Sequence, residues 1–185
     1  MKNSLIVIAT AVCFVLSNFS MAQTTAADNK LSQFTTSRSI PKGSSLFGVF
    51  QGRPACAGTA NQLGVEIPAD CAKLKWSLTL YKDPATLQPS TYELWIVGGG
   101  DVVKTEGGSY RQKILNGKWK IVKGTRSNPG AELYEMELTQ SGNHFYLLKG
   151  DENVLFVLDE NKEFLVGDED FSYTINRVEL VPGKK

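Results

Sequence analysis

The chain has 185 residues, which suits one domain with a buried core and is short for two ordinary domains. Its 20 basic and 19 acidic residues leave a formal net charge of +1, which excludes the basic excess expected of nucleic-acid or anionic-membrane binding. The composition, 42% hydrophobic and 21% charged, is that of a globular protein. A single histidine excludes most histidine-dependent chemistry.

Residues 1–22 carry the three parts of a secretory signal peptide. Lys2 supplies the positive charge, residues 5–16 form an apolar run, and Ser20-Met21-Ala22 ends it with a small-x-small pattern. A bilayer-spanning helix would need roughly 20 apolar residues, so we expect no transmembrane helix in the mature chain. Cys13 lies inside the apolar run, which is the wrong context for lipidation. We therefore predict a periplasmic or secreted protein that begins near Gln23.

Residues 23–45 are rich in Ser, Thr and Ala without periodicity, and they predict a flexible leader. From Leu46 onward, apolar and polar residues alternate between turn-forming residues, which is typical of half-buried antiparallel strands. We place one β domain at 46–181 and a short tail at 182–185. A helix is credible only at 58–63.

Strands are predicted at 46–50, 73–81, 92–97, near Tyr110, and at 118–121, 133–138, 144–148, 154–158 and 171–180. Turn chemistry separates several of them, at Asn116-Gly117, 128–130, 141–143, 150–151 and 166–168. About eight or nine strands at this spacing favour a barrel or a sandwich. Because closure removes exposed sheet edges, we predict a small antiparallel β-barrel.

Cys56 and Cys71 are the only cysteines outside the signal peptide, and 14 residues separate them. In an oxidising compartment, a disulfide is the simplest prediction, stabilising the fold by roughly 3 kcal/mol. The alternatives are a thiolate pair that holds a soft metal such as copper(I), or two free thiols. Two sulfurs do not complete a four-ligand structural zinc site.

Other candidate residues favour structural roles. His144 is predicted to be a solvent-exposed residue at a strand end, and Met136 to fill the core. The acidic stretches 159–163 and 168–170 are predicted to be solvated hairpin tips, because Phe164 stands where a calcium loop needs glycine. No nucleophile elbow, H-E-x-x-H or cysteine–histidine signature is present, so we predict no enzyme.

Aromatic residues are dense in the predicted strands. Most should be core, while some could line a lumen for a small apolar ligand or a surface for a partner protein. These residues are Trp76, Trp95, Trp119, Tyr134, Phe145, Phe156 and Tyr173.

The residues around the two cysteines match a known pattern of an aromatic, a glycine, and a Pro-Cys-Ala-Asp-Cys run before an alternating strand. The matching residues are Phe50, Gly52, Pro54, Cys56, Ala69-Asp70-Cys71, Leu74, Leu78 and Leu80. Later landmarks follow in the same order, at Gly117-Lys118-Trp119, Leu147 to Asp151, Leu155, Leu158-Asp159 and Phe171 to Thr174. Over residues 46–180 the chain resembles the N-terminal domain of the NlpE family of envelope proteins.

The resemblance implies a small β-barrel similar in outline to a lipocalin, and a role in copper homeostasis or resistance, or in the envelope-stress response. Copper is the cofactor it makes possible. The family's cysteines are two residues apart, whereas the wider pair Cys56 and Cys71 suits a structural bridge. We predict an exported, non-enzymatic barrel protein. The alternative is a barrel module that binds a small apolar ligand or a partner protein of the cell envelope, with no nucleic-acid partner.

Overall fold

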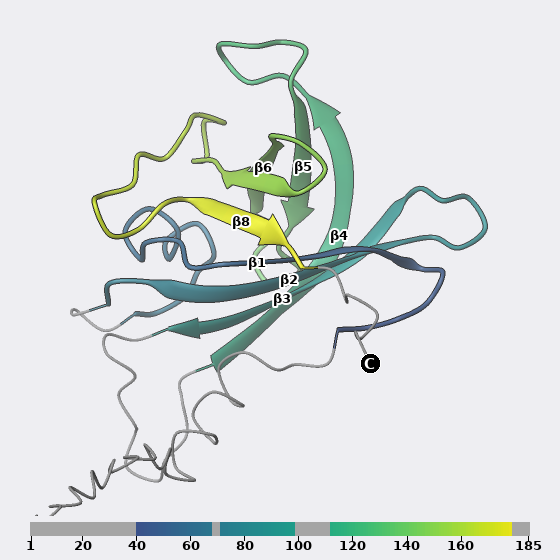
Figure 1. The fold of residues 1–185 in the computed structure, drawn as a ribbon, viewed down its shortest axis with the longest axis horizontal. Coiled ribbons are helices and arrows are strands. Elements are labelled where there is room, and N and C mark those ends of the chain that lie inside the picture. Colours follow the sequence, from purple (N-terminus) through teal and green to yellow (C-terminus); the bar gives the residue numbers. More distant parts are fainter. Residues whose placement is uncertain (1–39, 68–70, 99–111, 179–185) are drawn as a thin grey trace, which may run out of the picture. The chain divides into compact units, whose positions relative to one another are not determined.

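The computed structural model of the chain describes residues 40–67, 71–98 and 112–178 (Figure 1). The predicted signal peptide, most of the predicted leader, the strand expected near Tyr110 and the predicted tail lie outside these residues. The last residues of the predicted leader are described. There the Ser45 carbonyl accepts a hydrogen bond from the Lys82 N–H, which places this stretch beside the second strand.

Eight strands form a closed barrel in which each strand pairs antiparallel with its neighbours in sequence order. The strands are β1 (Leu46–Gly52), β2 (Leu74–Lys82), β3 (Pro89–Gly98), β4 (Gln112–Lys123), β5 (Glu132–Glu137), β6 (His144–Lys149), β7 (Val154–Val157) and β8 (Thr174–Arg177). The predicted all-β class and small antiparallel barrel are confirmed. Residues 58–63 form hydrogen-bonded turns, and the described residues contain no helix, hence none that could cross a bilayer.

The barrel interior is filled by large side chains. Alternation along β2 buries every second residue from Leu74 to Leu80, each at most 3% exposed. Near the start of β1, the rings of Phe47, Trp119 and Tyr134 pack together, with centroid separations of 4.9 to 5.9 Å. An eight-stranded barrel leaves an interior just wide enough for side chains, and these rings occupy it.

A second group of rings packs around Phe145. Its ring meets Trp76 and Tyr92 edge to face, with centroids 6.2 and 5.9 Å apart. Tyr173 and Met136 are buried as well, so the predicted core role of Met136 is confirmed. Trp95 and Phe156 are only partly buried, and Phe156 packs against Phe164 rather than in the main core.

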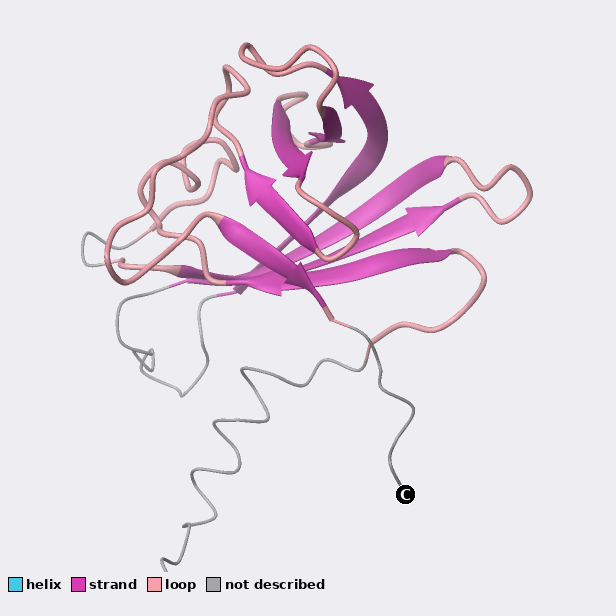
Figure 2. Cartoon of the chain, turned by 45° about the horizontal axis from the view of Figure 1, so that its top comes forward, coloured by secondary structure: helices cyan, strands magenta, loops and turns pink. Residues whose placement is uncertain are grey.

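Strand β4 pairs with two different strands along its length. Residues 112–118 pair with β3, and residues 119–123 pair with β5. Asn116-Gly117, which the sequence predicts as a turn, therefore lies inside a continuous strand, and this prediction is wrong. Gly117 is needed there because a Cβ would collide with the backbone oxygen of Glu137. The glycine thus permits a corner, from which β4 curves away from the β2–β3 hairpin (Figure 2).

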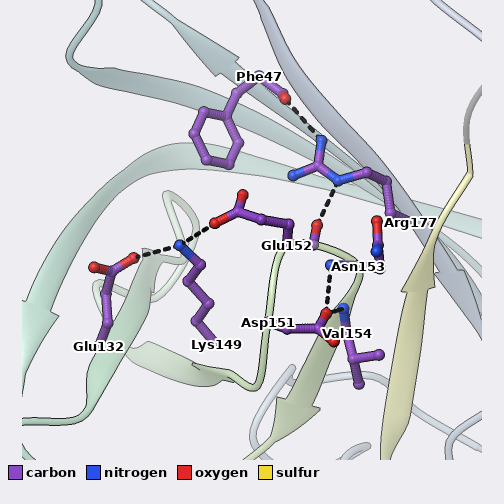
Figure 3. Close-up of polar contacts among 8 residues, drawn as sticks. All are labelled: Phe47, Glu132, Lys149, Asp151, Glu152, Asn153, Val154 and Arg177. Atoms are coloured by element: carbon purple, nitrogen blue, oxygen red, sulfur yellow. Dashed lines mark hydrogen bonds and ion pairs between the residues drawn. The ribbon is translucent and has the colours of Figure 1, made fainter.

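Arg177 closes the barrel between its last strand and its first (Figure 3). The β1–β8 ladder has only three residue pairs. The Arg177 guanidinium donates from Nη1 to the Phe47 carbonyl at 3.1 Å and from Nε to the Glu152 carbonyl at 2.6 Å. It also lies 4.7 Å from the ring centroid of Phe50, within cation–π range.

The turn between β6 and β7 supports this closure. Asp151 Oδ1 accepts hydrogen bonds from the N–H groups of Asn153 and Val154, which fixes the turn (Figure 3). Lys149 Nζ bridges Glu152 and Glu132 at 2.6 and 3.4 Å. The β1–β8 ladder is therefore short, but Arg177 reinforces it through a carbonyl of β1 and a carbonyl of a turn that Asp151 and Lys149 hold in place.

Candidate binding groove and the disulfide loop

The connection between β1 and β2 is tied by a disulfide between Cys56 and Cys71, with their Cα atoms 5.9 Å apart. This confirms the predicted pairing. Backbone hydrogen bonds flank the bridge, from the Cys56 N–H to the Ala72 carbonyl and from the Leu74 N–H to the Pro54 carbonyl. Cys56 is 1% exposed, so the bridge is anchored in the core.

The metal-binding alternative for Cys56 and Cys71 requires this bond to be reduced, because a disulfide offers no thiolate. Cys71 lies close to Lys73, whose carbonyl is 3.8 Å from Sγ. Repulsion from Arg53 and Lys73 adds to burial in lowering the pKa of Lys75, so cations gather on this face. Among the residues that the structure describes, no three His, Cys, Asp or Glu side chains come together to hold a metal ion.

Aspartates at turns use their carboxylates within the backbone. Asp159 Oδ1 accepts from the N–H groups of Asn161 and Glu163, and Asp168 Oδ1 accepts from those of Asp170 and Phe171. These are the predicted acidic tips, and their carboxylates stabilise turns.

A groove lies outside the barrel, at the place where β4 leaves β3. Residues 83–91 of the β2–β3 hairpin form one wall, and 118–120 of β4 with Glu135, Glu137 and His144 form the other. Its volume is about 430 Å³, within the range of ligand-binding clefts. We call this feature the groove. Figure 1 shows the two strands diverging at this position.

The charged groups of the second wall are connected. Glu135 Oε1 pairs with Lys120 Nζ at 2.9 Å and lies 3.3 Å from His144 Nδ1. The hydrogen bond and charge of Glu135 raise the pKa of Lys120. Glu135 is only 12% exposed, whereas the Lys120 side chain is 64% exposed, so the lysine presents its charge to the groove.

The floor and the opposite wall are fixed by other hydrogen bonds. Tyr92 donates to the Glu137 carbonyl at 2.9 Å, and burial followed by the Glu137 charge raises the pKa of this phenol. Trp119 Nε1 donates to the Tyr81 carbonyl at 2.6 Å, joining β4 to the end of β2. Asp83 Oδ1 accepts from the N–H groups of Ala85 and Thr86 and shapes the hairpin tip.

The sequence located His144 at a strand end but not in a groove. It begins β6 with its side chain 39% exposed, beside a carboxylate that the sequence did not single out. Glu135, Lys118 and Lys120 are not predicted as site residues, because the sequence starts a strand at Lys118, after an expected turn, rather than continuing it from β3's partner residues. The alternation of Lys118 and Lys120 predicts an exposed strand face but not the groove beside it.

The interior offers less to a ligand than the groove. Its rings contact one another, and a guest would have to displace them. Of the buried side-chain nitrogen and oxygen atoms that the structure describes, Trp76 Nε1 alone has no hydrogen-bond partner. One donor is too little to orient a polar guest.

No family model, no curated protein and no solved structure matches the chain. Function is therefore inferred from the residues and their geometry.

Proposed function

We propose that this chain is an exported, non-enzymatic β-barrel protein of the cell envelope that binds a partner protein in the groove. The observation that carries the proposal is the opening of the sheet between β3 and β4, which forms a cleft of about 430 Å³ outside a barrel whose interior is packed with aromatic rings. Export is inferred from the signal-like residues 1–22.

A protein partner suits the groove better than a small apolar ligand. The walls carry charged and hydroxyl residues, as interface rims do, and the cleft is open to solvent on the barrel surface. A small apolar guest would instead need an enclosed apolar cavity. The β2–β3 hairpin and β4 are both well-paired elements, so the two walls are held in place.

In-cell photocrosslinking tests this proposal. A photoreactive residue at Thr91, on the groove wall, should yield a defined cross-linked product with one envelope protein. The same residue at Glu169, in the exposed β7–β8 connection, is the matched control and should not. Equal products from both positions, or none from Thr91, would contradict the proposal. A small apolar molecule that co-purifies in equal amount with the native protein would favour the alternative.

A second candidate function, in copper homeostasis or the envelope-stress response, is supported by the resemblance to the NlpE N-terminal domain. The fold brings Pro54 and Cys56 together with Cys71 and Leu74, so both halves of the family-like run meet. Lys73, two residues after Cys71, lies among the cations Arg53 and Lys75, and cations close to a thiolate stabilise it. Soft thiolates are the ligands that copper(I) prefers.

Competition with a chromogenic copper(I) chelator tests the direct form of this role. The reduced protein should remove copper(I) from the chelator, whereas the oxidised protein and Cys56→Ser should not. Failure of the reduced protein to compete would exclude Cys56 and Cys71 as a copper site. It would leave the groove proposal intact, because the groove contains no cysteine.

A further inference from the structure

In the part of the chain that the structure describes, one edge of β4 has no strand beside it beyond Lys118. The ladder between β3 and β4 ends at the pair Thr91–Lys118, while the ladder between β4 and β5 runs from Trp119 to Lys123. Within the described residues, the backbone of β4 beyond Lys118 is therefore paired on the β5 side only. The groove lies along this edge, since 118–120 form part of its wall.

The direction of the free backbone groups follows from the register. The Gly124 N–H bonds to the Ala131 carbonyl, just beyond the β4–β5 ladder. In antiparallel pairs, hydrogen-bonded positions alternate with positions whose N–H and C=O point away. Lys120 and Val122 therefore bond to β5. The N–H and C=O groups of Trp119, Ile121 and Lys123 point toward the opening.

The register of the next ladder gives the same result. The Leu138 N–H bonds to the Asn143 carbonyl, so even-numbered residues of β5 direct their backbone groups to β6. Odd-numbered residues, among them Leu133 and Glu135, are left to bond β4. Their partners are Val122 and Lys120.

We propose that this edge of β4 binds an extended segment of the partner protein by strand addition, and that the segment alternates acidic with apolar residues. The inference rests on the proposed function and names the chemistry of the partner. Main-chain hydrogen bonds supply affinity in such complexes, and alternate side chains supply specificity.

Lysine charges beside this edge favour acidic residues in the partner's segment. Lys118 and Lys120 lie two residues apart and share the outer face of β4, so both would flank the added strand. Lys118 forms no ion pair with another described residue, and Glu135 is paired with Lys120. Of the other carboxylates that line the groove, Glu137 lies on β5, one strand farther away, and Asp83 Oδ1 accepts from two backbone N–H groups. Edge lysines oppose pairing with a second copy of the same strand, but they attract a strand that carries carboxylates.

The other face of the same edge favours apolar residues in the partner's segment. Ile121 lies between Trp119 and Lys123, on the face that continues the barrel interior, and is 43% exposed. An added strand would place every second side chain over Ile121 and cover it. An alternating acidic and apolar segment therefore fits both faces at once.

Fluorescence anisotropy with a labelled peptide tests the proposal. The probe is a peptide of about seven alternating Glu and Val residues, long enough to pair with the free edge. We expect the Glu and Val peptide to bind the purified full chain saturably, with an affinity that salt lowers. The matching peptide of Lys and Val should not bind. An N-methylated Glu and Val peptide lacks alternate N–H donors. Its affinity should be lower by about tenfold or more.

Two proline variants on the same strand provide the structural control. Ile121→Pro removes an N–H that β5 does not use, so the barrel should persist while peptide affinity falls about tenfold or more. Ile114→Pro changes an equally exposed isoleucine, also 43%, in the half of β4 that pairs with β3. Its N–H points away from β3 by the same alternation, and peptide affinity should not change.

Each opposite result overturns the proposal. Strand addition at this edge would be excluded if the Glu and Val peptide did not bind. It would also be excluded if neither Ile121→Pro nor N-methylation changed the peptide affinity. Concentration-dependent dimers abolished by Ile121→Pro would assign the edge to a second copy instead. If the Thr91 cross-link persists in Ile121→Pro, the proposed function stands while strand addition fails.

Discussion

Two seams of the barrel, each the line along which two neighbouring strands pair, differ in a way that the number of paired residues does not explain. The β1–β8 seam has three residue pairs and stays closed, whereas the β3–β4 seam has seven and then opens into the groove. At the short seam, Arg177 bonds to carbonyls of two other elements. At the long seam, Trp95 Nε1 donates to Gln112 within the ladder, and beyond it the Trp119 indole donates to the Tyr81 carbonyl of β2. A short ladder that a charged side chain reinforces therefore stays closed, whereas a longer ladder still ends where β4 exchanges β3 for β5.

The largest expected effect comes from breaking the closed seam. Arg177→Ala should lower the free energy of unfolding by about 3 kcal/mol, because two backbone carbonyls lose a charged donor. Urea denaturation measures this change. Arg126→Ala is the control, since it removes only an exposed pair with Glu163 and should cost less than about 0.5 kcal/mol. Equal losses for the two variants would contradict the role of Arg177.

The next effect concerns the corner of β4 at the open seam. Gly117→Ala should destabilise the fold by about 2 kcal/mol, because the added Cβ meets the Glu137 backbone. Gly130→Ala is the matched control, since its Cβ would meet Asn128 Oδ1 at an ordinary 3.5 Å. Thermal unfolding followed by circular dichroism compares them. A neutral Gly117→Ala would show that the corner does not need glycine.

A smaller effect is expected at the bridge across the open seam. Trp119→Phe keeps an aromatic ring but leaves the Tyr81 carbonyl without its donor, which should cost about 1 kcal/mol. Trp95→Phe loses an exposed hydrogen bond to Gln112 and should cost less. Urea denaturation of both variants measures the difference. A larger loss in Trp95→Phe would remove the basis for treating Trp119 as the bridge.

The smallest effect is a pH dependence at the hairpin that forms one groove wall. Hydrogen bonds from Thr86 and Ala85 lower the pKa of Asp83 below its ordinary value. A depressed pKa in the folded state adds stability above the ordinary pKa, and this stability is lost as the pH falls through the folded value. Asp83→Asn should therefore flatten the acid limb of the stability profile. An unchanged limb would show that this carboxylate does not stabilise the hairpin.

The fold could be predicted largely because its signals are local. The two-residue alternation from Leu74 to Leu80 predicts β2, and the cysteine pair outside the signal-like residues, Cys56 and Cys71, predicts the bridge. The groove could not be predicted, because it depends on where β4 exchanges one partner strand for another. Asn116-Gly117 has the composition of a turn, and only tertiary pairing makes it a corner. The role of Arg177 is equally non-local, since its carbonyl partner on Phe47 is 130 residues away.

Amide hydrogen exchange along β4 tests the open seam most directly. If one edge is free, the N–H groups of Ile121 and Lys123 exchange rapidly while those of Lys120 and Val122, bonded to β5, are protected. We expect this alternation in the protein without a partner. Uniform protection of all four amides would contradict it, because the edge would then already be paired.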